Sequence, residues 1–422
     1  MNRIGHWLAP LLLALAVMGL RCADAAPALS PPVYQALEAI REDMTHQRLA
    51  AARRRLEALL RQDRLSAYER AIAWQTRADL ALRQSDYPAA ARALRRCLAG
   101  QALPASTARP LRRTLGQLLL QLHRTDEAIR VLRDWLRQLR SPRAEDHALL
   151  ASAYAAARQY APAVKELTTA VHQARDFHAE WYEALAAMEY QRRRYRACLP
   201  WLETLLRRRP GRKADWLRLA AVQLALKDPA AALATLETAH RAGLLQSGDE
   251  LLSLVRLQLQ VGVPYRAARL LAQGMQAGRI RDDAEHRRLL ARAWGQARET
   301  ARAAAALERS LGKVPTPASR LQLARWYARL ERWRDLLRVL PCRGRRGADA
   351  GRCWLLRGAA HYELGERDDA RADFRRAEAV AASRAAARRW LRFLRLDPAA
   401  AGTTSVDHQD VAPGALQHPV GG

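Results

Sequence analysis

The chain has 422 residues and a formal net charge of +29, from 71 Lys and Arg against 42 Asp and Glu. Half of its residues are hydrophobic, which excludes a wholly disordered chain, and 21 Gly with 19 Pro exclude a collagen-like or linker-dominated one. A single segment is apolar enough to enter a membrane, which excludes a protein with several membrane spans. The positive charge is almost entirely arginine, because the only lysines are Lys165, Lys213, Lys227 and Lys313.

Residues 1–25 predict a secretory signal peptide. Arg3 supplies the positive start, Leu8 to Leu20 is apolar, and Ala23-Asp24-Ala25 is a small-residue cleavage site. The apolar run is shorter than the roughly 18–20 residues that a membrane-spanning helix needs. We therefore expect cleavage and a periplasmic location. An uncleaved inner-membrane anchor is one alternative, and lipid attachment at Cys22 is another, although the residue before it is not small, as a lipobox requires.

A small residue recurs along the rest of the chain at intervals of 33 to 38 residues. Hairpins of the tetratricopeptide repeat (TPR) type need one where their second helix begins, because the two antiparallel helices come closest there. Each hairpin alone exposes an apolar face to solvent, and stacking of a neighbouring hairpin buries it. The recurring residues are Ala52, Ala90, Ala128, Ala163, Cys198, Ala232, Ala267, Ala303, Leu336 and Ala370.

This register predicts an all-α TPR solenoid. We expect a right-handed superhelix of about ten helix-turn-helix hairpins over residues 33–382, a capping helix over 383–395 and a disordered tail over 396–422. Leu336 is the one bulky member of the series, and it predicts looser packing within the ninth hairpin. Turns between paired helices are predicted at Ser85-Asp86, Asp228-Pro229, Gly262-Val263-Pro264 and Gly365.

Two pairs of cysteines remain once Cys22 is removed. Cys342 is expected to end the second helix of the ninth hairpin, and Cys353 to start the next helix. Such antiparallel ends are neighbours, so the two cysteines are a disulfide candidate in an oxidising compartment. Cys97 and Cys198 fall at small buried positions of hairpins that are three repeats apart, and they are expected to be unpaired core residues.

The sequence contains no motif of a zinc protease, a nucleotide-binding P-loop, an α/β-hydrolase or a C-x-x-C redox site. His172 and His178 are six residues apart, which puts them on different faces of a helix. His147 stands where TPR hairpins usually have tryptophan, so it is expected to pack rather than to catalyse. We therefore predict that the protein is not an enzyme and has no catalytic residue, cofactor or metal site.

A solenoid of this kind offers a concave groove, lined by the first helix of each hairpin, in which extended or helical peptides can lie. Its candidate protein-binding residues by position are Asp79, Leu82, Tyr190, Arg218, Arg325 and Tyr362. The densest charge lies in the runs Arg53–Arg55, Arg192–Arg194 and Arg207–Arg209. These runs are either solvated helix faces or a docking stripe for an acidic partner or anionic lipid headgroups, whose carboxylate and phosphate groups suit the arginine fork.

Three stretches carry a narrower resemblance. They are WLRLAAVQLALKDPAAALATLETAHRAGLL at Trp216 to Leu245, VGVPYRAARLLAQGM at Val261 to Met275, and SRAAARRWLRFL at Ser383 to Leu394. The chain resembles the periplasmic TPR proteins that accompany TonB, ExbB and ExbD, the TtpC-like group. The resemblance implies a non-enzymatic accessory of the complex that energises uptake of iron-siderophore, haem or similar ligands across the outer membrane. It implies TonB, ExbB or ExbD as partners.

Two other functions stay open from the sequence. A periplasmic TPR scaffold for polysaccharide export or envelope assembly would use the same groove for a different partner. A cytoplasmic repeat protein would use its arginines on the phosphates of nucleic acid. Export would remove nucleic acid as a partner, so the second alternative depends on residues 1–25 not being a signal peptide.

Overall fold

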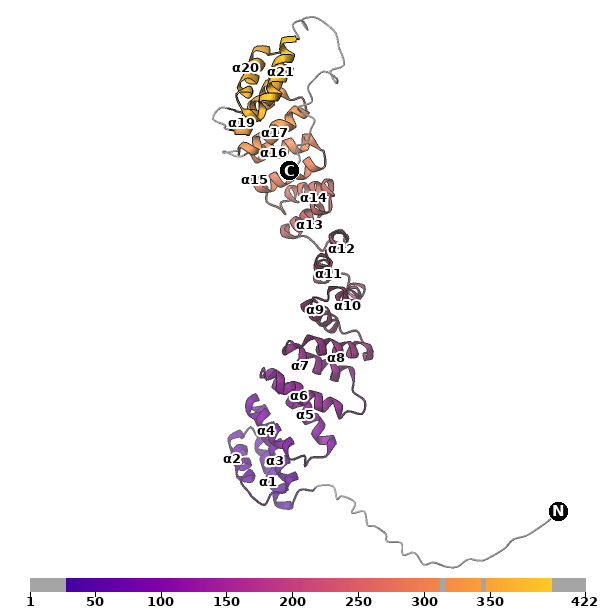
Figure 1. The fold of residues 1–422 in the computed structure, drawn as a ribbon. Helices are drawn as coiled ribbons and strands as arrows, with labels where there is room; N and C mark the ends of the chain where they lie inside the picture. The colour runs from indigo at the N-terminus through magenta and orange to yellow at the C-terminus, as the bar shows by residue number, and fades with distance from the viewer. Residues whose placement is uncertain (1–27, 312–315, 343–346, 397–422) are drawn as a thin grey trace, which may run out of the picture. The chain divides into compact units, whose positions relative to one another are not determined.

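The structure is a computed structural model, and it describes residues 28–311, 316–342 and 347–396 (Figure 1). These residues form α-helices and one short 3-10 helix, and none of them lies in a strand. The chain divides into two compact units, Met1–Cys198 and Leu199–Gly422, called here the first and the second unit. The predicted signal peptide and the tail from Asp397 onward lie outside the described residues.

The helices of the first unit form hairpins of two helices each. They are α1 (Pro31–Thr45), α2 (Leu49–Leu60), α3 (Ala67–Arg83), α4 (Tyr87–Ala99), α5 (Ala105–Gln121), α6 (Thr125–Arg137), α7 (Ala144–Ala156), α8 (Tyr160–Gln173) and α9 (Ala179–Gln191). The next helix, α10 (Tyr195–Arg208), runs across the boundary between the units.

The second unit continues the pattern and adds a final helix. It contains α11 (Lys213–Ala225), α12 (Pro229–Arg241), α13 (Gly248–Val261), α14 (Pro264–Gln276), α15 (Ala284–Gln296), α16 (Thr300–Ser310), α17 (Pro317–Arg329), α18 (Trp333–Val339), α19 (Gly347–Glu363), α20 (Arg367–Glu378), η1 (Ala381–Ser383) and α21 (Arg384–Leu396). The predicted all-α TPR solenoid of helical hairpins is confirmed. Among the described residues, no helix combines the length and the apolar character that crossing a bilayer requires.

The recurring small residues are the closest contacts of the hairpins. All ten of them, from Ala52 to Ala370, have 0% exposure. Leu336 is among them, and it lies in one core cluster with Tyr327 and Leu340. The second helix of this hairpin, α18, is only seven residues long, and the looser packing expected between α17 and α18 stays a prediction.

Each hairpin reverses through one residue with positive φ, between 56° and 83°, five residues before its small residue. In all ten, the N–H of the following residue donates to the carbonyl oxygen five residues earlier, the bond that defines a Schellman motif. Only two of the ten turn residues are glycines. The ten are Gln47, Ser85, His123, Arg158, Arg193, Lys227, Gly262, Arg298, Glu331 and Gly365.

Cys342 and Cys353 are joined by a disulfide, with their Cα atoms 5.7 Å apart. Their places differ from those expected: Cys342 follows the end of α18, and Cys353 lies two turns inside α19. Because α18 ends at Val339, Leu340 and Cys342 lie beyond the helix, and the Arg357 guanidinium of α19 donates to the Leu340 carbonyl oxygen at 3.4 Å. Cys97 and Cys198 are free and buried, and burial raises the pKa of both thiols to about 11.

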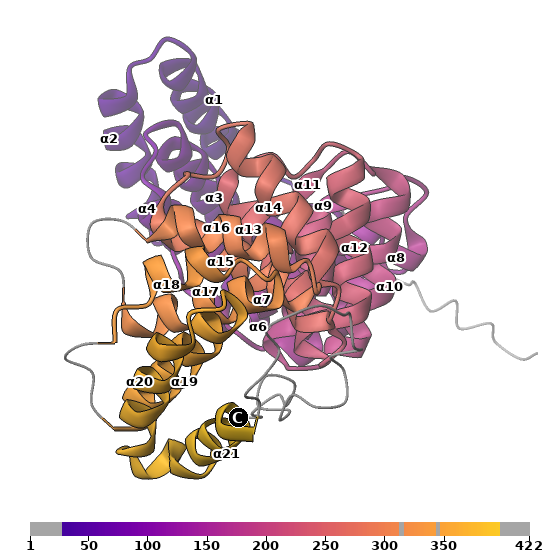
Figure 2. The same ribbon diagram turned by 90° about the horizontal axis from the view of Figure 1, so that it is seen from above.

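The last helix, α21, packs beside α20 (Figures 1 and 2). The ring of Trp390 stacks on that of Phe374 with 5.1 Å between their centroids, and Tyr362 lies 5.6 Å from Trp390. These rings close the apolar end of the tenth hairpin, as a capping helix does. Leu396 is the last residue of α21, whereas the sequence had placed it at the start of the tail.

Candidate functional site

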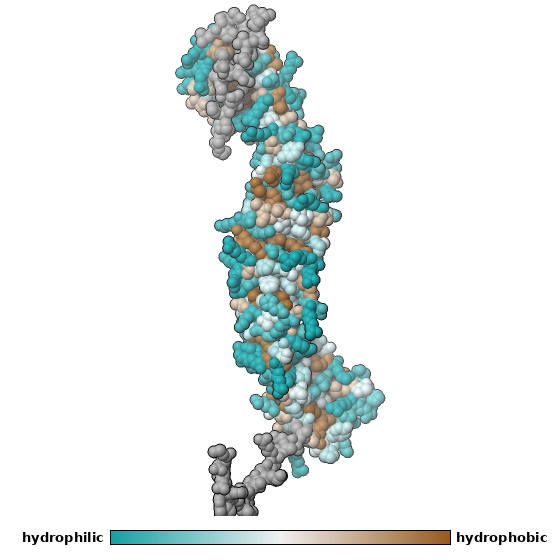
Figure 3. Space-filling model, turned by 90° about the vertical axis from the view of Figure 1, so that its right-hand side faces the viewer, coloured by the Kyte–Doolittle hydropathy of each residue, from teal (hydrophilic) through white to brown (hydrophobic). Residues whose placement is uncertain are grey.

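On the face that Figure 3 shows, hydrophobic side chains form separate patches among hydrophilic ones, and no broad apolar area is seen among the described residues. In the first unit, however, there is a hollow of about 710 Å³ between the first helices of neighbouring hairpins. It is lined by Arg41, Met44 and Thr45 of α1, by Ile72, Gln75, Thr76, Asp79, Leu82 and Arg83 of α3, and by Thr107 of α5.

The spacing along α3 explains the hollow. Ile72, Gln75, Asp79 and Leu82 are three or four residues apart, so they project from one face of the helix. Two of them, Asp79 and Leu82, are predicted groove residues, and the structure brings them together. Gln75 was missed, although counting one turn back from Asp79 would have found it.

Hydrogen bonds to Glu69 hold the N-terminal ends of α1 and α3, two helices that line the hollow, together. The Ser30 hydroxyl donates to Glu69 Oε1 at 2.6 Å and the Ser30 N–H at 2.9 Å. The Ser66 N–H donates to Glu69 Oε2, and the Ser66 side chain accepts from the Glu69 N–H, which completes a capping box. These bonds, those from Ser30 first, lower the pKa of Glu69 to about 2. The carboxylate therefore stays ionised and fixes the start of both helices.

The charges of the hollow are only partly neutralised. Arg41 pairs with Glu38 at 2.5 Å, whereas Arg83 forms no ion pair with a described residue. The pKa of Asp79 is raised, because burial disfavours its charged form. The nearby charges of Arg83 and Arg41 lower this pKa, but their effect is smaller. The Gln75 amide has no partner among the described residues. The hollow thus offers amide, hydroxyl, carboxylate and guanidinium groups beside the apolar Met44 and Leu82, a mixture that suits an extended peptide.

The other predicted groove residues have different surroundings. Tyr190 is 39% exposed and meets Tyr195 edge to face at 5.1 Å. Arg218 donates to Asp215 at 3.2 Å and stands one position away from the inner face of α11. Arg325 is exposed on α17. Tyr362 is half-buried, and its ring lies 5.6 Å from that of Trp390 and 5.7 Å from that of Phe393 on the last helix.

The inner face of α11 instead carries two large apolar side chains that sequence reasoning missed. Leu217 and Leu224 are 39% and 44% exposed, and they are seven residues apart with Ala221 between them. They stand at the same places in their hairpin as Gln75 and Leu82 in theirs. The signal was present in the register, because Leu217 and Leu224 stand 15 and 8 residues before the small residue Ala232, as Gln75 and Leu82 stand before Ala90.

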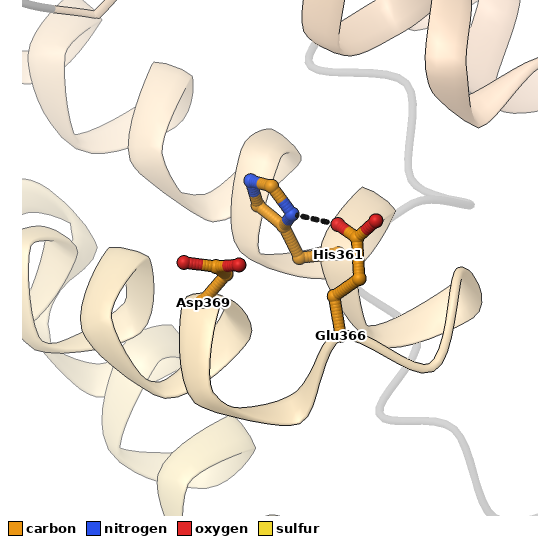
Figure 4. A group of neighbouring side chains, drawn as sticks. All are labelled: His361, Glu366 and Asp369. Carbon is orange, nitrogen blue, oxygen red and sulfur yellow. Dashed lines mark hydrogen bonds and ion pairs between the residues drawn. The ribbon is translucent and has the colours of Figure 1, made fainter.

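Three side chains around the turn from α19 to α20 have the types and spacing of metal ligands (Figure 4). Possible ligand atoms of His361, Glu366 and Asp369 lie within 4.8 Å of one another. His361 Nδ1 is already 2.5 Å from Glu366 Oε2, and the Arg357 guanidinium lies 3.4 Å from His361 Nε2. Since a neighbouring cation opposes the binding of a second one, we interpret the group as a polar network that links α19 to α20.

No protein-family model matches the sequence, and no curated protein matches it either. Among solved structures, a TPR protein from Parabacteroides merdae is 13% identical over 77% of this chain and 98% of its own, with a TM-score of 0.33. MamA is 17% identical over 40% of this chain and 94% of its own (TM-score 0.32). The type IV pilus biogenesis factor PilW is 16% identical over 50% and 94% (TM-score 0.32). These likenesses identify no partner for this chain.

Proposed function

We propose that this protein is a non-catalytic scaffold that binds a peptide segment of another protein in the hollow of its first unit. The hollow carries this proposal, because four residues on one face of α3 line it together with Arg41 and Met44 of α1. The unpartnered Gln75 amide can bond the backbone of an extended peptide, and Met44 and Leu82 can contact its side chains. Helix caps around Glu69 keep the two helices in place without a ligand.

The finer proposal is a periplasmic accessory of a TonB–ExbB–ExbD complex that serves uptake of iron-siderophore, haem or similar ligands. The resemblance at Trp216 to Leu245, Val261 to Met275 and Ser383 to Leu394 supports it, as does the signal-like start of the sequence. The disulfide between Cys342 and Cys353 favours an oxidising compartment over the cytoplasm, and so over the nucleic-acid alternative. Scaffolding in polysaccharide export or envelope assembly remains the rival with a different partner.

Site-specific photo-crosslinking in native envelopes tests both levels of the proposal. A benzophenone side chain at Gln75 should capture a partner protein, and the same group at Arg92, exposed on the second helix α4, should not. TonB, ExbB or ExbD in the crosslinked band supports the finer proposal, and an export or assembly protein supports the rival. Equal capture from both positions would contradict binding in the hollow. A periplasmic reporter fused after Ala26 tests location, and a silent reporter would contradict export.

A further inference from the structure

The inner face of the second unit carries a row of arginines that the proposed hollow does not use. Arg256 on α13, Arg292 on α15 and Arg325 on α17 each stand eleven residues before the small residue of their hairpin. Asp79 and Arg41, which line the hollow of the first unit, have the same register. These three arginines therefore occupy the helix face that corresponds to the lining of the hollow in the first unit. Together with Arg288, four residues before Arg292, they are called here the arginine stripe.

The stripe is not neutralised by the protein. All four arginines are exposed as whole residues, with the Arg325 guanidinium partly shielded, and none forms an ion pair with a described residue. Elsewhere in the same unit, arginines pair with carboxylates one turn away, as Arg332 does with Asp335 and Arg302 does with Glu299. Exposed arginines without ion pairs also occur on second helices, so the stripe is distinguished by its place on the inner face beside partly exposed leucines.

Like charges are also held close together on this face. Arg288 and Arg292 are four residues apart on α15, a spacing at which like charges repel. Shielding from water, and next the charge of Arg352 on α19, lower the pKa of Arg325, which puts the two guanidiniums within electrostatic reach. Such repulsion costs stability in the free protein, and an anionic ligand relieves it.

Few carboxylates lie near the stripe on its own helices. Asp249 is seven residues before Arg256, about 10 Å along the helix axis at 1.5 Å per residue, whereas Glu285 is one turn before Arg288. Neither forms an ion pair with the stripe. Asp349 favours the charge of Arg325, but its ion pair, at 3.7 Å, is with Arg352. Arginines therefore outnumber the carboxylates along the stripe.

We propose that the arginine stripe binds an extended acidic segment of a partner protein, with apolar residues next to its carboxylates. The positive charge favours carboxylates, which the guanidinium fork binds in a bidentate way. The neighbouring surface favours apolar side chains. Leu252 and Leu259 flank Arg256 on α13. Leu217 and Leu224 are exposed on the preceding first helix, α11. A peptide can cover both kinds of surface, whereas a phosphate polymer would leave the leucines exposed to water. This inference rests on the proposed scaffold function and adds the chemistry of the ligand.

The test is a binding measurement on the full-length protein. The probe is a fluorescein-labelled synthetic peptide with two leucines followed by a run of glutamates, and fluorescence anisotropy gives its Kd. The stripe variant replaces Arg256, Arg292 and Arg325 by alanine. The matched control replaces Arg269, Arg334 and Arg375, which are exposed on second helices and also lack ion pairs with described residues. Both variants lose the same charge. Circular dichroism melting checks that both fold.

The stripe variant should bind the peptide at least about tenfold more weakly, since three exposed charge pairs are removed, and the control should change by less than about twofold. Binding by the unchanged protein should weaken as salt rises from about 50 to about 300 mM. Equal losses in both variants would show a response to bulk charge and overturn the inference. Tighter, stripe-dependent binding of oligothymidine or of phosphatidylglycerol vesicles would overturn it in favour of phosphate. No peptide binding by the unchanged protein would also overturn it.

The crosslink from Gln75 separates this inference from the scaffold function itself. If the stripe variant keeps that crosslink and binds the acidic peptide as tightly as the unchanged protein, the result supports the scaffold function and contradicts the acidic ligand. If the crosslink is absent while the stripe binds the acidic peptide, the hollow is the part that fails.

Discussion

The ring of Phe374 lies so close to Gly358 that a Cβ added to the glycine would meet two ring atoms at 2.7 Å. Phe374 cannot retreat, because its other face stacks on Trp390 of the last helix. Gly358 is therefore required by packing between α19 and α20, since it lies within a helix where alanine would otherwise be favoured.

We expect Gly358→Ala to lower the free energy of unfolding by ~1–2 kcal/mol. Overpacking costs typically ~1–3 kcal/mol and exceeds the gain in helix propensity of ~1 kcal/mol. Chemical or thermal denaturation followed by circular dichroism measures the change. Gly100→Ala is the control, because nothing lies within 4 Å of its added Cβ and its φ is −81°. A Gly358→Ala protein as stable as the unchanged one would mean that α21 does not hold Phe374 in place.

The hairpin turns predict opposite effects for two substitutions. Gly365 has φ of 79° and open space around its added Cβ, so Gly365→Ala should destabilise by ~1 kcal/mol through backbone conformation alone. Lys227 adopts φ of 61° in the equivalent turn, so Lys227→Gly should raise the stability slightly or leave it unchanged. Denaturant titration of both variants checks the signs. Destabilisation of similar size by both would contradict the shared turn conformation.

Glu69 should make stability depend on pH in the acid range. Its pKa is about 2 in the folded protein against the ordinary value of 4.5 for a glutamate, so the unfolded chain binds the proton more tightly. Its contribution is therefore complete above about pH 5 and is lost as the pH falls toward 2. At neutral pH, Glu69→Gln should destabilise by ~1–3 kcal/mol, because charge-assisted bonds from Ser30 and Ser66 are lost. Midpoints of unfolding measured from pH 7 to pH 3 should show a flatter profile for this variant.

The exposed Glu203 on α10 provides the control for that experiment. It has no partner among the described residues, so Glu203→Gln should leave the acid profile of the protein as it was. The same flattening in both variants would attribute the effect to net charge rather than to the Glu69 bonds.

The disulfide predicts a change in thiol count and in stability. Adding reductant to the denatured protein should expose two further thiols, those of Cys342 and Cys353. Cys342→Ser combined with Cys353→Ser should lower the stability by up to ~3 kcal/mol, as expected from the entropy of closing a short loop. An unchanged thiol count would show that the cysteines are reduced in the protein as purified.

The repeat could be predicted from the sequence because its determinant is local. A small residue at near-constant intervals reports the closest approach of two helices, and all ten such positions are fully buried. The turns at Gly262 and Gly365 were also visible, since glycine readily adopts positive φ. The turns at Arg158, Arg193 and Arg298 were not, because hydrogen bonding within the hairpin imposes positive φ on residues that do not favour it.

The candidate site was harder to predict, because exposure depends on neighbouring helices. Asp79 and Leu82 were found by register alone, and the structure places both in the hollow. Tyr362 has the same register as Leu82, and its ring lies beside those of Trp390 and Phe393 on the last helix. Arg218 was predicted to line the groove, but the residue of α11 with the register of the inner face is its neighbour Leu217. The positions of Cys342 and Cys353 relative to the helix ends were predicted wrongly, because the periodicity of the sequence does not show that α18 is short.

The constant distance between turn and small residue has a consequence for how this chain can change length. Ten times, five residues separate the two features, while successive small residues are 33 to 38 apart. An insertion within that five-residue segment would rotate the second helix away from its partner, whereas one in the linker to the next hairpin leaves every hairpin intact. Relatives of this protein should therefore differ in linker length and share an invariant core segment.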